Sequence, residues 1–446
     1  MTSDAHPEAE QLKARAAACY EAGDLKGAHE CLSRLLELCP GDAEALNDAG
    51  TVSYALGRRD QARGYYVRAL RADPQYAPAR QNLAMLCRAV GAMPDALLRE
   101  AEGGRPSRRD ISVVVPLNSR FDVFAFCLEG LWNQTFGAER YEVLTVANGV
   151  GPQEIGELRR LIDTWKARYG ERLRLIEVEQ ASIALARNAG IREAEGAVIM
   201  QINEDAVLSR TALERHWAAH EEFGFNPRSV LLGGRSFPAA YHRRFFNYLY
   251  EAAGLYMPLH QPHPRFLGDY QWFVTCNLSC PAEAYERFGF YDPTYAWGSD
   301  TELGWRRERA GCLDLHVDTG IHGYHLHDLT FEGHRSNCLK RAPFQFRLRT
   351  GRWPCEATEE ERQEARDAVQ ADGLDLAAFE AELRRLEAEW PGPNAFAGMT
   401  VMGKQAATLR EFHFLITPLI KVYRRRLHFA ELLRLMARGR QEVAVR

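Results

Sequence analysis

The sequence predicts an α/β domain built on a parallel sheet, with a helical solenoid before it and a helical region after it. An internal repeat with a period of 34 residues runs through residues 8–104. From Asp110 onward, short apolar runs alternate with helix-like patterns, which is typical of a doubly wound parallel sheet. Beyond about Phe346 the chain is helical in pattern and rich in charge. We therefore expect three domains, at residues 8–104, 110–345 and 346–446.

Composition narrows the function classes. The chain has 446 residues, of which 46% are apolar and 26% charged, as in a soluble globular protein. Its net charge of −4 gives no electrostatic reason to expect a nucleic-acid partner. The polar N-terminus is not a signal peptide, and no apolar stretch is long enough for a transmembrane segment. The ten cysteines lack zinc-site spacing, so we expect a cytoplasmic protein with reduced thiols.

The N-terminal repeat is carried by small residues. Gly23, Gly57 and Gly91 are each 34 residues apart, and so are Ala28, Ala62 and Ala96. This pattern resembles tetratricopeptide helix pairs, most closely in the second copy, and the third copy fades near Glu100. The resemblance implies a stack of helix pairs. Such a stack is either a spacer or a concave surface for a protein partner, and the sequence leaves both interpretations open.

The segment of the α/β region with the strongest candidate ligand-binding residues is the apolar run 197–202, which is followed by Asn203-Glu204-Asp205. The run predicts a strand buried on both faces of the sheet. Ligands of such sheets bind beyond the carboxyl ends of the strands, and acidic residues there are candidates to hold a divalent cation. The alternative is a solvated turn, since Asn and Asp are ordinary turn residues.

Seven ordered motifs carry a family resemblance. They are Pro116 to Arg120, Trp132 to Thr135, Val143 to Gly149, Ala186 to Ile191, Gly196 to Asp205, Cys276 to Ser279 and Trp297 to Arg306. In this order they resemble family 2 glycosyltransferases of the GT-A fold, over roughly residues 110–330. The resemblance implies an inverting transfer of a sugar from a nucleotide-diphosphate sugar to a hydroxyl.

The resemblance also implies a metal site for Mn or Mg. Asp205 aligns with the second Asp of the family's Asp-x-Asp motif, usually a metal ligand. Asn203 replaces the first Asp and brings no charge, so Glu204 is expected to take over part of the role of that Asp in binding the metal. A histidine often supplies another ligand, and His325 aligns best, with His327 as the alternative. Zinc held by the histidines is a further alternative, although no nearby cysteine completes such a site.

The acceptor hydroxyl needs a base. Asp300 aligns with the family's catalytic Asp, while Ser299 replaces the Glu before it. Glu302 aligns with a residue that contacts the acceptor or supports the base. Asp300 could instead be a plain helix cap.

The donor site departs most from the family. Ala147 and Asn148 replace two Asp residues, one of which usually pairs with the base of the nucleotide. Asn148 can both donate and accept, so a UDP-sugar is the expected donor while another base stays open. The full set of expected donor-binding residues is Pro116, Asn118, Asn148, Arg187, Asn188, Asn203, Glu204 and Asn277.

Two later segments leave alternatives open. Residues 234–275 are rich in aromatic side chains, which suit either an acceptor groove or a buried core. The stretch from Phe412 to Leu435 contains Arg424-Arg425-Arg426 and forms either a helix packed on the catalytic domain or a basic helix on a membrane surface. The second interpretation would place the protein at the inner membrane face.

The predicted function is therefore an inverting glycosyltransferase acting on a glycan or glycolipid. A degenerate GT-A domain that only binds nucleotide or glycan is one alternative, motivated by Ala147, Asn203 and Ser299. A glycosyltransferase whose protein acceptor is presented by the repeats is another.

Overall fold

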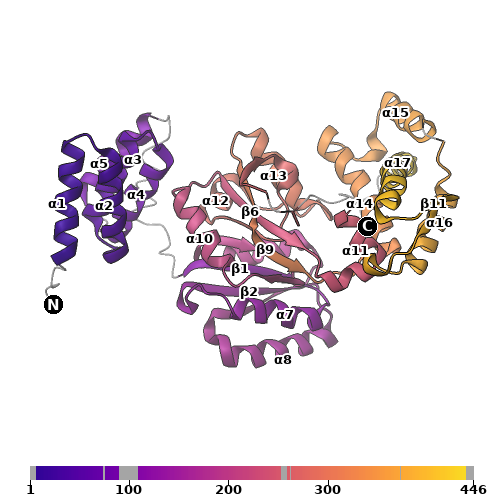
Figure 1. Cartoon of the computed structure of the whole chain (residues 1–446), viewed down its shortest axis with the longest axis horizontal. Coiled ribbons are helices and arrows are strands. Elements are labelled where there is room, and N and C mark those ends of the chain that lie inside the picture. Colours follow the sequence, from indigo (N-terminus) through magenta and orange to yellow (C-terminus); the bar gives the residue numbers. More distant parts are fainter. Residues whose placement is uncertain are drawn as a thin grey trace.

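The structure is a computed structural model that describes residues 7–73, 76–89, 109–252, 259–261, 263–371 and 373–437. Figure 1 shows a bundle of helices at one end, an α/β domain in the middle and a second group of helices at the other end. The predicted fold class, an α/β domain between two helical regions, is confirmed.

The N-terminal region is a stack of helix pairs. Gly50 shows why the repeat needs small residues, because a Cβ atom there would lie 2.5 Å from the ring of Tyr66. Gly91 and Ala96 of the predicted repeat lie outside the described residues, like the rest of residues 90–108. The helices of the stack are α1 (Pro7–Glu21), α2 (Leu25–Leu38), α3 (Ala43–Ala55), α4 (Arg59–Ala72) and α5 (Ala77–Ala89).

The central sheet is mixed rather than wholly parallel. Within the described residues it has nine strands, in the order β3-β2-β1-β4-β8-β6-β9-β5, with β7 paired to β9. Strands β3, β2, β1 and β4 are parallel, as predicted, but β8 runs antiparallel to β4 and β6, and β5 antiparallel to β9. The strands are β1 (Arg109–Leu117), β2 (Tyr141–Asn148), β3 (Leu173–Val178), β4 (Gly196–Gln201), β5 (Ala206–Leu208), β6 (Ser229–Ser236), β7 (Phe266–Gly268), β8 (Leu278–Pro281) and β9 (Asp314–His325).

The parallel pairing predicted from the first four strands is therefore confirmed, and the strands after β4 add antiparallel pairs that were not predicted. A parallel pair needs a long crossover connection between its strands, usually a helix. The chain after β4 does not keep to that pattern: it turns within Asn203-Glu204-Asp205 into the short β5, which pairs with the distant β9.

Helices cover both faces of the sheet. Alternate residues of β1 belong to opposite cores, with Val113 and Val115 on one face and Val114 on the other. The first face is covered by α7 (Phe121–Trp132), α8 (Pro152–Tyr169) and α10 (Ala212–Glu222), and the second by α9 (Ile183–Glu193), α12 (Glu283–Phe288) and α13 (Ser299–Arg309).

The C-terminal helices build a separate apolar core around α11 (Phe245–Ala252). Phe237, Phe245 and Phe246 are buried in it, so the buried-core interpretation is confirmed for these aromatic residues. Ile416 and Tyr423 of α17 are also fully buried there, so α17 packs back on the protein. The remaining elements are α14 (Phe331–Thr350), α15 (Glu359–Gln370), α16 (Leu376–Glu389), α17 (Leu409–Met436) and the hairpin of β10 (Met399–Val401) and β11 (Lys404–Ala406).

Among the helices of the described residues, none combines the length and apolarity needed to cross a membrane.

The packing of α17 can be tested with a matched pair of substitutions. Phe412 is fully buried, whereas Phe414, two residues along the same helix, is 80% exposed. Phe412→Ala should lower the free energy of unfolding of this core by about 3–5 kcal/mol, because it opens a cavity. Phe414→Ala should change it by less than about 0.5 kcal/mol in the same denaturant titration. Equal effects of the two substitutions would contradict this packing.

Candidate functional site

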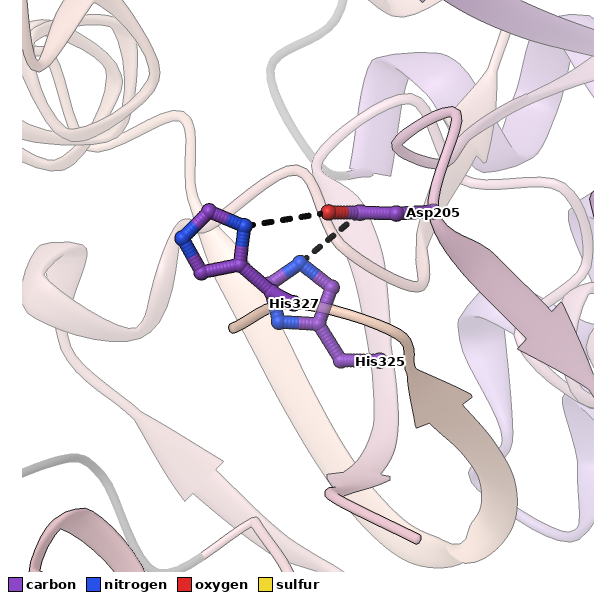
Figure 2. A group of neighbouring side chains, drawn as sticks. All are labelled: Asp205, His325 and His327. Carbon is purple, nitrogen blue, oxygen red and sulfur yellow. Dashed lines mark ion pairs between the residues drawn. The ribbon is translucent and has the colours of Figure 1, made fainter. Parts of the chain in front are cut away.

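A carboxylate and two imidazoles meet where β5 pairs with β9. Asp205 lies between the ends of β4 and β5 and is only 4% exposed. His325 ends β9, where it pairs with Ala206, and the amide of Leu326 donates to the carbonyl of Asp205 at 2.7 Å. Figure 2 shows both rings directed at the carboxylate of Asp205, with His325 Nε2 2.9 Å from Oδ1 and His327 Nδ1 3.3 Å from Oδ2.

This cluster is suited to a divalent cation. One ligand atom from each of Asp205, His325 and His327 lies within 4.8 Å of the others. Asp205 Oδ1 and His325 Nδ1 are buried and make no aligned hydrogen bond with any described residue. A carboxylate oxygen with two imidazole nitrogens is a donor set for first-row divalent metals. His322, three residues before His325 on β9, instead contacts the hydroxyl of Ser236 at 2.9 Å.

The protonation states of Asp205 and His325 also suit metal binding. Burial would raise the pKa of Asp205, but contacts with His325 and His327 outweigh it and hold this pKa far below its usual range. Burial lowers the pKa of His325 to about 4, although Asp205 opposes the shift. At neutral pH the carboxylate is thus charged and His325 neutral, as metal ligation requires.

Glu204 has a different character from its neighbour. Burial, and then the charge of Asp205, raises the pKa of Glu204 to about 7. Glu204 is therefore only partly ionised at neutral pH. This limits how far it can replace the negative charge that Asn203 lacks. The carbonyl of Asn203 accepts from the amide of Ala206 at 3.1 Å and closes the turn into β5.

Two residues outside the predicted set hold the cluster. Arg120, between β1 and α7, donates to Asp205 Oδ2 at 3.2 Å and to the carbonyl of Leu326 at 2.9 Å. Asn247 of α11 is fully buried and donates to the carbonyl of His327 at 2.7 Å, while its own side-chain oxygen accepts from the amide of Leu329. Arg120 ends the first of the seven motifs and Asn247 lies within the aromatic-rich segment, but neither residue was assigned a role from the sequence.

The predicted base lies at the start of α13. Asp300 Oδ2 accepts from both the amide and the hydroxyl of Thr275, at 3.3 and 3.2 Å, and Oδ1 accepts from the amide of Thr301. These bonds fix the orientation of the carboxylate. Glu302 is 5% exposed and makes a two-pronged ion pair with Arg306, which places it as a support for α13.

The predicted donor residues divide into two groups. Asn118 and Asn148 join the ends of β1 and β2, because Asn118 donates to the carbonyl of Asn148 at 2.7 Å and Asn148 Oδ1 accepts from the amide of Ser182. Pro116 is buried within β1. Arg187 is 6% exposed, its guanidinium carbon lies 5.5 Å from the ring centre of Tyr291, and its buried Nε has no hydrogen-bond partner among the described residues.

Asn188 and Asn277 are instead engaged with the protein. The amide of Asn188 bonds both the carbonyl and the N–H of Tyr291. Asn277 is 1% exposed and donates to the carbonyls of Gly234 and Ile321. Its oxygen faces His216 Nε2 at 3.0 Å, so both side chains serve to tie loops and strands together.

An apolar groove of about 870 Å³ runs beside the cluster, between α7 and the paired β5 and β9. Tyr324 and Leu326 line it and alternate with His325 along the chain, which places the groove on the opposite side of that strand from the imidazole of His325. Other lining residues include Phe126, Gly130, Val207, Pro238 and Tyr241.

Two parts of the chain match models of known protein families. Residues 112–256 match the family model for Glycosyl transferase family 2. This part of the chain, about a third of its length, is thus similar to family 2 glycosyl transferases. Residues 9–52 match the Tetratricopeptide repeat model, so the glycosyl transferase domain is preceded by a tetratricopeptide region, as predicted.

The individual relatives are more distant. The chain is 32% identical over 107 residues to Glycosyltransferase AglE of Haloferax volcanii, which is 24% of this chain and 33% of that protein. The match therefore spans about a third of this curated relative. Among solved structures, the mannosyltransferase PcManGT from Pyrobaculum calidifontis in complex with GDP-Man and Mn²⁺ is 17% identical, with a TM-score of 0.40 over 83% of this chain and 96% of that one. S. aureus TarS is 13% identical, with a TM-score of 0.38 over 73% of this chain and 55% of that one.

A buried histidine pair on α10 gives a pH-dependent prediction. His216 and His220 of α10 both contact the hydroxyl of Ser279, at 2.7 and 2.8 Å, and burial lowers their pKa values to about 4 and about 3. An ordinary histidine titrates near pH 6.5. The unfolded chain therefore binds more protons than the folded chain between about pH 6.5 and 4, so the contribution of this pair to stability is present above pH 6.5 and is lost as the pH falls.

The measurement is the free energy of unfolding between pH 7.5 and 5. Wild type should lose stability as the pH falls, and His220→Gln should lose less, by a slope difference of about one proton. An identical slope in His220→Gln would contradict a neutral, buried His220.

Proposed function

We propose that this protein is an inverting, divalent-cation-dependent glycosyltransferase that moves a sugar from a nucleoside-diphosphate sugar to a hydroxyl. The observation that carries the proposal is the cluster of Asp205, His325 and His327: Asp205 follows β4 within the residues that match the family 2 glycosyl transferase model, and the two histidines reach it from the end of β9. Ligands of open α/β sheets bind at this edge.

The three clustered side chains would hold the cation. The bound cation would neutralise the charge of the diphosphate leaving group. Because two of the three ligand atoms are imidazole nitrogens, the donor set favours Mn²⁺ over the harder Mg²⁺. Zinc is the alternative with the same ligands, and a metal screen decides between them.

Asp300 is the proposed general base. Its carboxylate accepts the proton of the acceptor hydroxyl as the acceptor oxygen forms a bond to the anomeric carbon. The bond from that carbon to the diphosphate oxygen breaks on the opposite face, and the nucleoside diphosphate leaves with the electron pair. Thr275 holds the carboxylate in one orientation, and Glu302 supports its helix through Arg306.

Electrostatic interactions connect the base to the cation cluster. Burial raises the pKa of the Cys276 thiol, and the charge of Arg235 opposes that shift; burial lowers the pKa of His325, and the charge of Arg235 adds to that shift. The same thiol responds to the charges of Asp300 and Arg187. These shared interactions support a single site, in which Arg187 with its unpaired Nε would face the diphosphate.

A UDP-sugar is the proposed donor, and Asn118 and Asn148 are the proposed contacts to its base. The acceptor is proposed to be a glycan or glycolipid, and the apolar groove beside β9 supports an acceptor with an apolar portion. A protein acceptor presented by the tetratricopeptide repeats is a rival of this proposal, and a domain that binds without turnover is a rival outcome of the assay below.

The assay is release of nucleoside diphosphate from a panel of UDP- and GDP-sugars with Mn²⁺. Asp300→Asn should lower turnover by about 10²–10⁴-fold because the base is lost. Asp205→Asn should abolish most of the Mn²⁺-dependent activity. The control is Asp314→Asn at the start of β9, which removes an exposed ion pair with Arg228 and should keep wild-type turnover.

Wild-type turnover in both Asp300→Asn and Asp205→Asn would contradict the assignment of the site. Donor binding by wild type without turnover on any donor would favour the binding-only alternative.

A further inference from the structure

The guanidinium of Arg120 contacts potential ligand atoms of the proposed cation site. Its Nη1 lies 3.2 Å from Asp205 Oδ2 and 3.2 Å from His327 Nδ1. These two acceptor atoms are themselves 3.3 Å apart, so the three atoms form a nearly equilateral triangle. Arg120 thus contacts potential ligand atoms of two of the three residues in the proposed cation site.

The chemistry of the contact makes it competitive. An arginine side chain offers only donors and keeps its charge at all accessible pH values. In the tautomer of His327 that is protonated at Nε2, Nδ1 presents its lone pair to Arg120, as it would to a metal. Asp205 Oδ2 likewise accepts a hydrogen bond from the guanidinium. Arg120 and a cation would therefore compete for the same lone pairs.

Arg120 has room to leave this position. Its side chain is 31% exposed, whereas that of Asp205 is 6% exposed. Arg120 precedes the first residue of α7, but its side chain makes no capping hydrogen bond to that helix. The fold of α7 therefore does not depend on where the guanidinium points.

We propose that Arg120 is a tethered counter-cation of this site: it holds Asp205 and His327 until a divalent cation and a nucleoside diphosphate bind, and it then transfers its hydrogen bonds to the diphosphate oxygens. The inference rests on the proposed function and adds a residue that governs cation affinity and diphosphate affinity in opposite directions. A guanidinium suits this exchange because carboxylates and phosphates both accept its planar donors.

Isothermal titration calorimetry with two probes tests the exchange, using the full chain and no turnover. Mn²⁺ alone is titrated into wild type and Arg120→Gln, and UDP is then titrated at saturating Mn²⁺. Arg120→Gln should bind Mn²⁺ roughly tenfold more tightly, because a charged competitor is gone, and should bind UDP roughly tenfold more weakly, because a charge-assisted contact is lost. Arg120→Lys should fall between wild type and Arg120→Gln in both titrations.

The control variant is Arg215→Gln, which removes another exposed arginine that pairs with Asp318, and should bind both probes as wild type does. A merely structural Arg120 would leave the two affinities unchanged or weaken both, and either result overturns the inference while wild type still binds Mn²⁺ and UDP. A wild-type protein that takes up no Mn²⁺ would overturn the proposed function together with the inference. Thermal unfolding of each variant confirms that it is folded.

Discussion

The site depends on the antiparallel pairing of β5 with β9. Only three residues of β5 take part, Ala206 to Leu208, and they pair with residues that lie more than a hundred positions later in the chain. This pairing places Asp205 beside His325, and the bond from the Leu326 amide to the Asp205 carbonyl sets their separation. A shift of register by one residue would turn His325 to the groove side and Tyr324 to the carboxylate.

The C-terminal helices contribute to the site as well as to stability. They share a core with α11, and α11 carries Asn247, which binds the backbone on both sides of Asp328. The segment that presents His327 is therefore held from behind by a helix whose own position depends on α14, α16 and α17. The aromatic residues Phe237, Phe245 and Phe246 serve this support, and Phe237 also stacks on the ring of His325, with ring centres 6.0 Å apart.

The sequence predicted much of this arrangement and missed specific parts of it. Strands β1 to β4 and their helices follow from local periodicity, and Asp205 and His325 follow from ordered motifs. The antiparallel half of the sheet did not, because pairing between β4 and β8 or between β5 and β9 is long-range and leaves no local pattern. Arg120 and Asn247 were missed for a similar reason, since their roles come from atoms that only the fold brings to them. The engagement of Glu302 by Arg306 is local, at four residues along a helix, and could have been foreseen.

The central claim is that Asp205, His325 and His327 together hold a divalent cation. Pulsed electron paramagnetic resonance of the Mn²⁺-loaded protein reads this directly, because imidazole nitrogens bound to Mn²⁺ couple to its electron spin. The account predicts coupling from two nitrogens, loss of one in His325→Gln and of the other in His327→Gln, and no change in His322→Gln, whose ring faces Ser236. A Mn²⁺ signal without nitrogen coupling, or one that neither substitution alters, would contradict it.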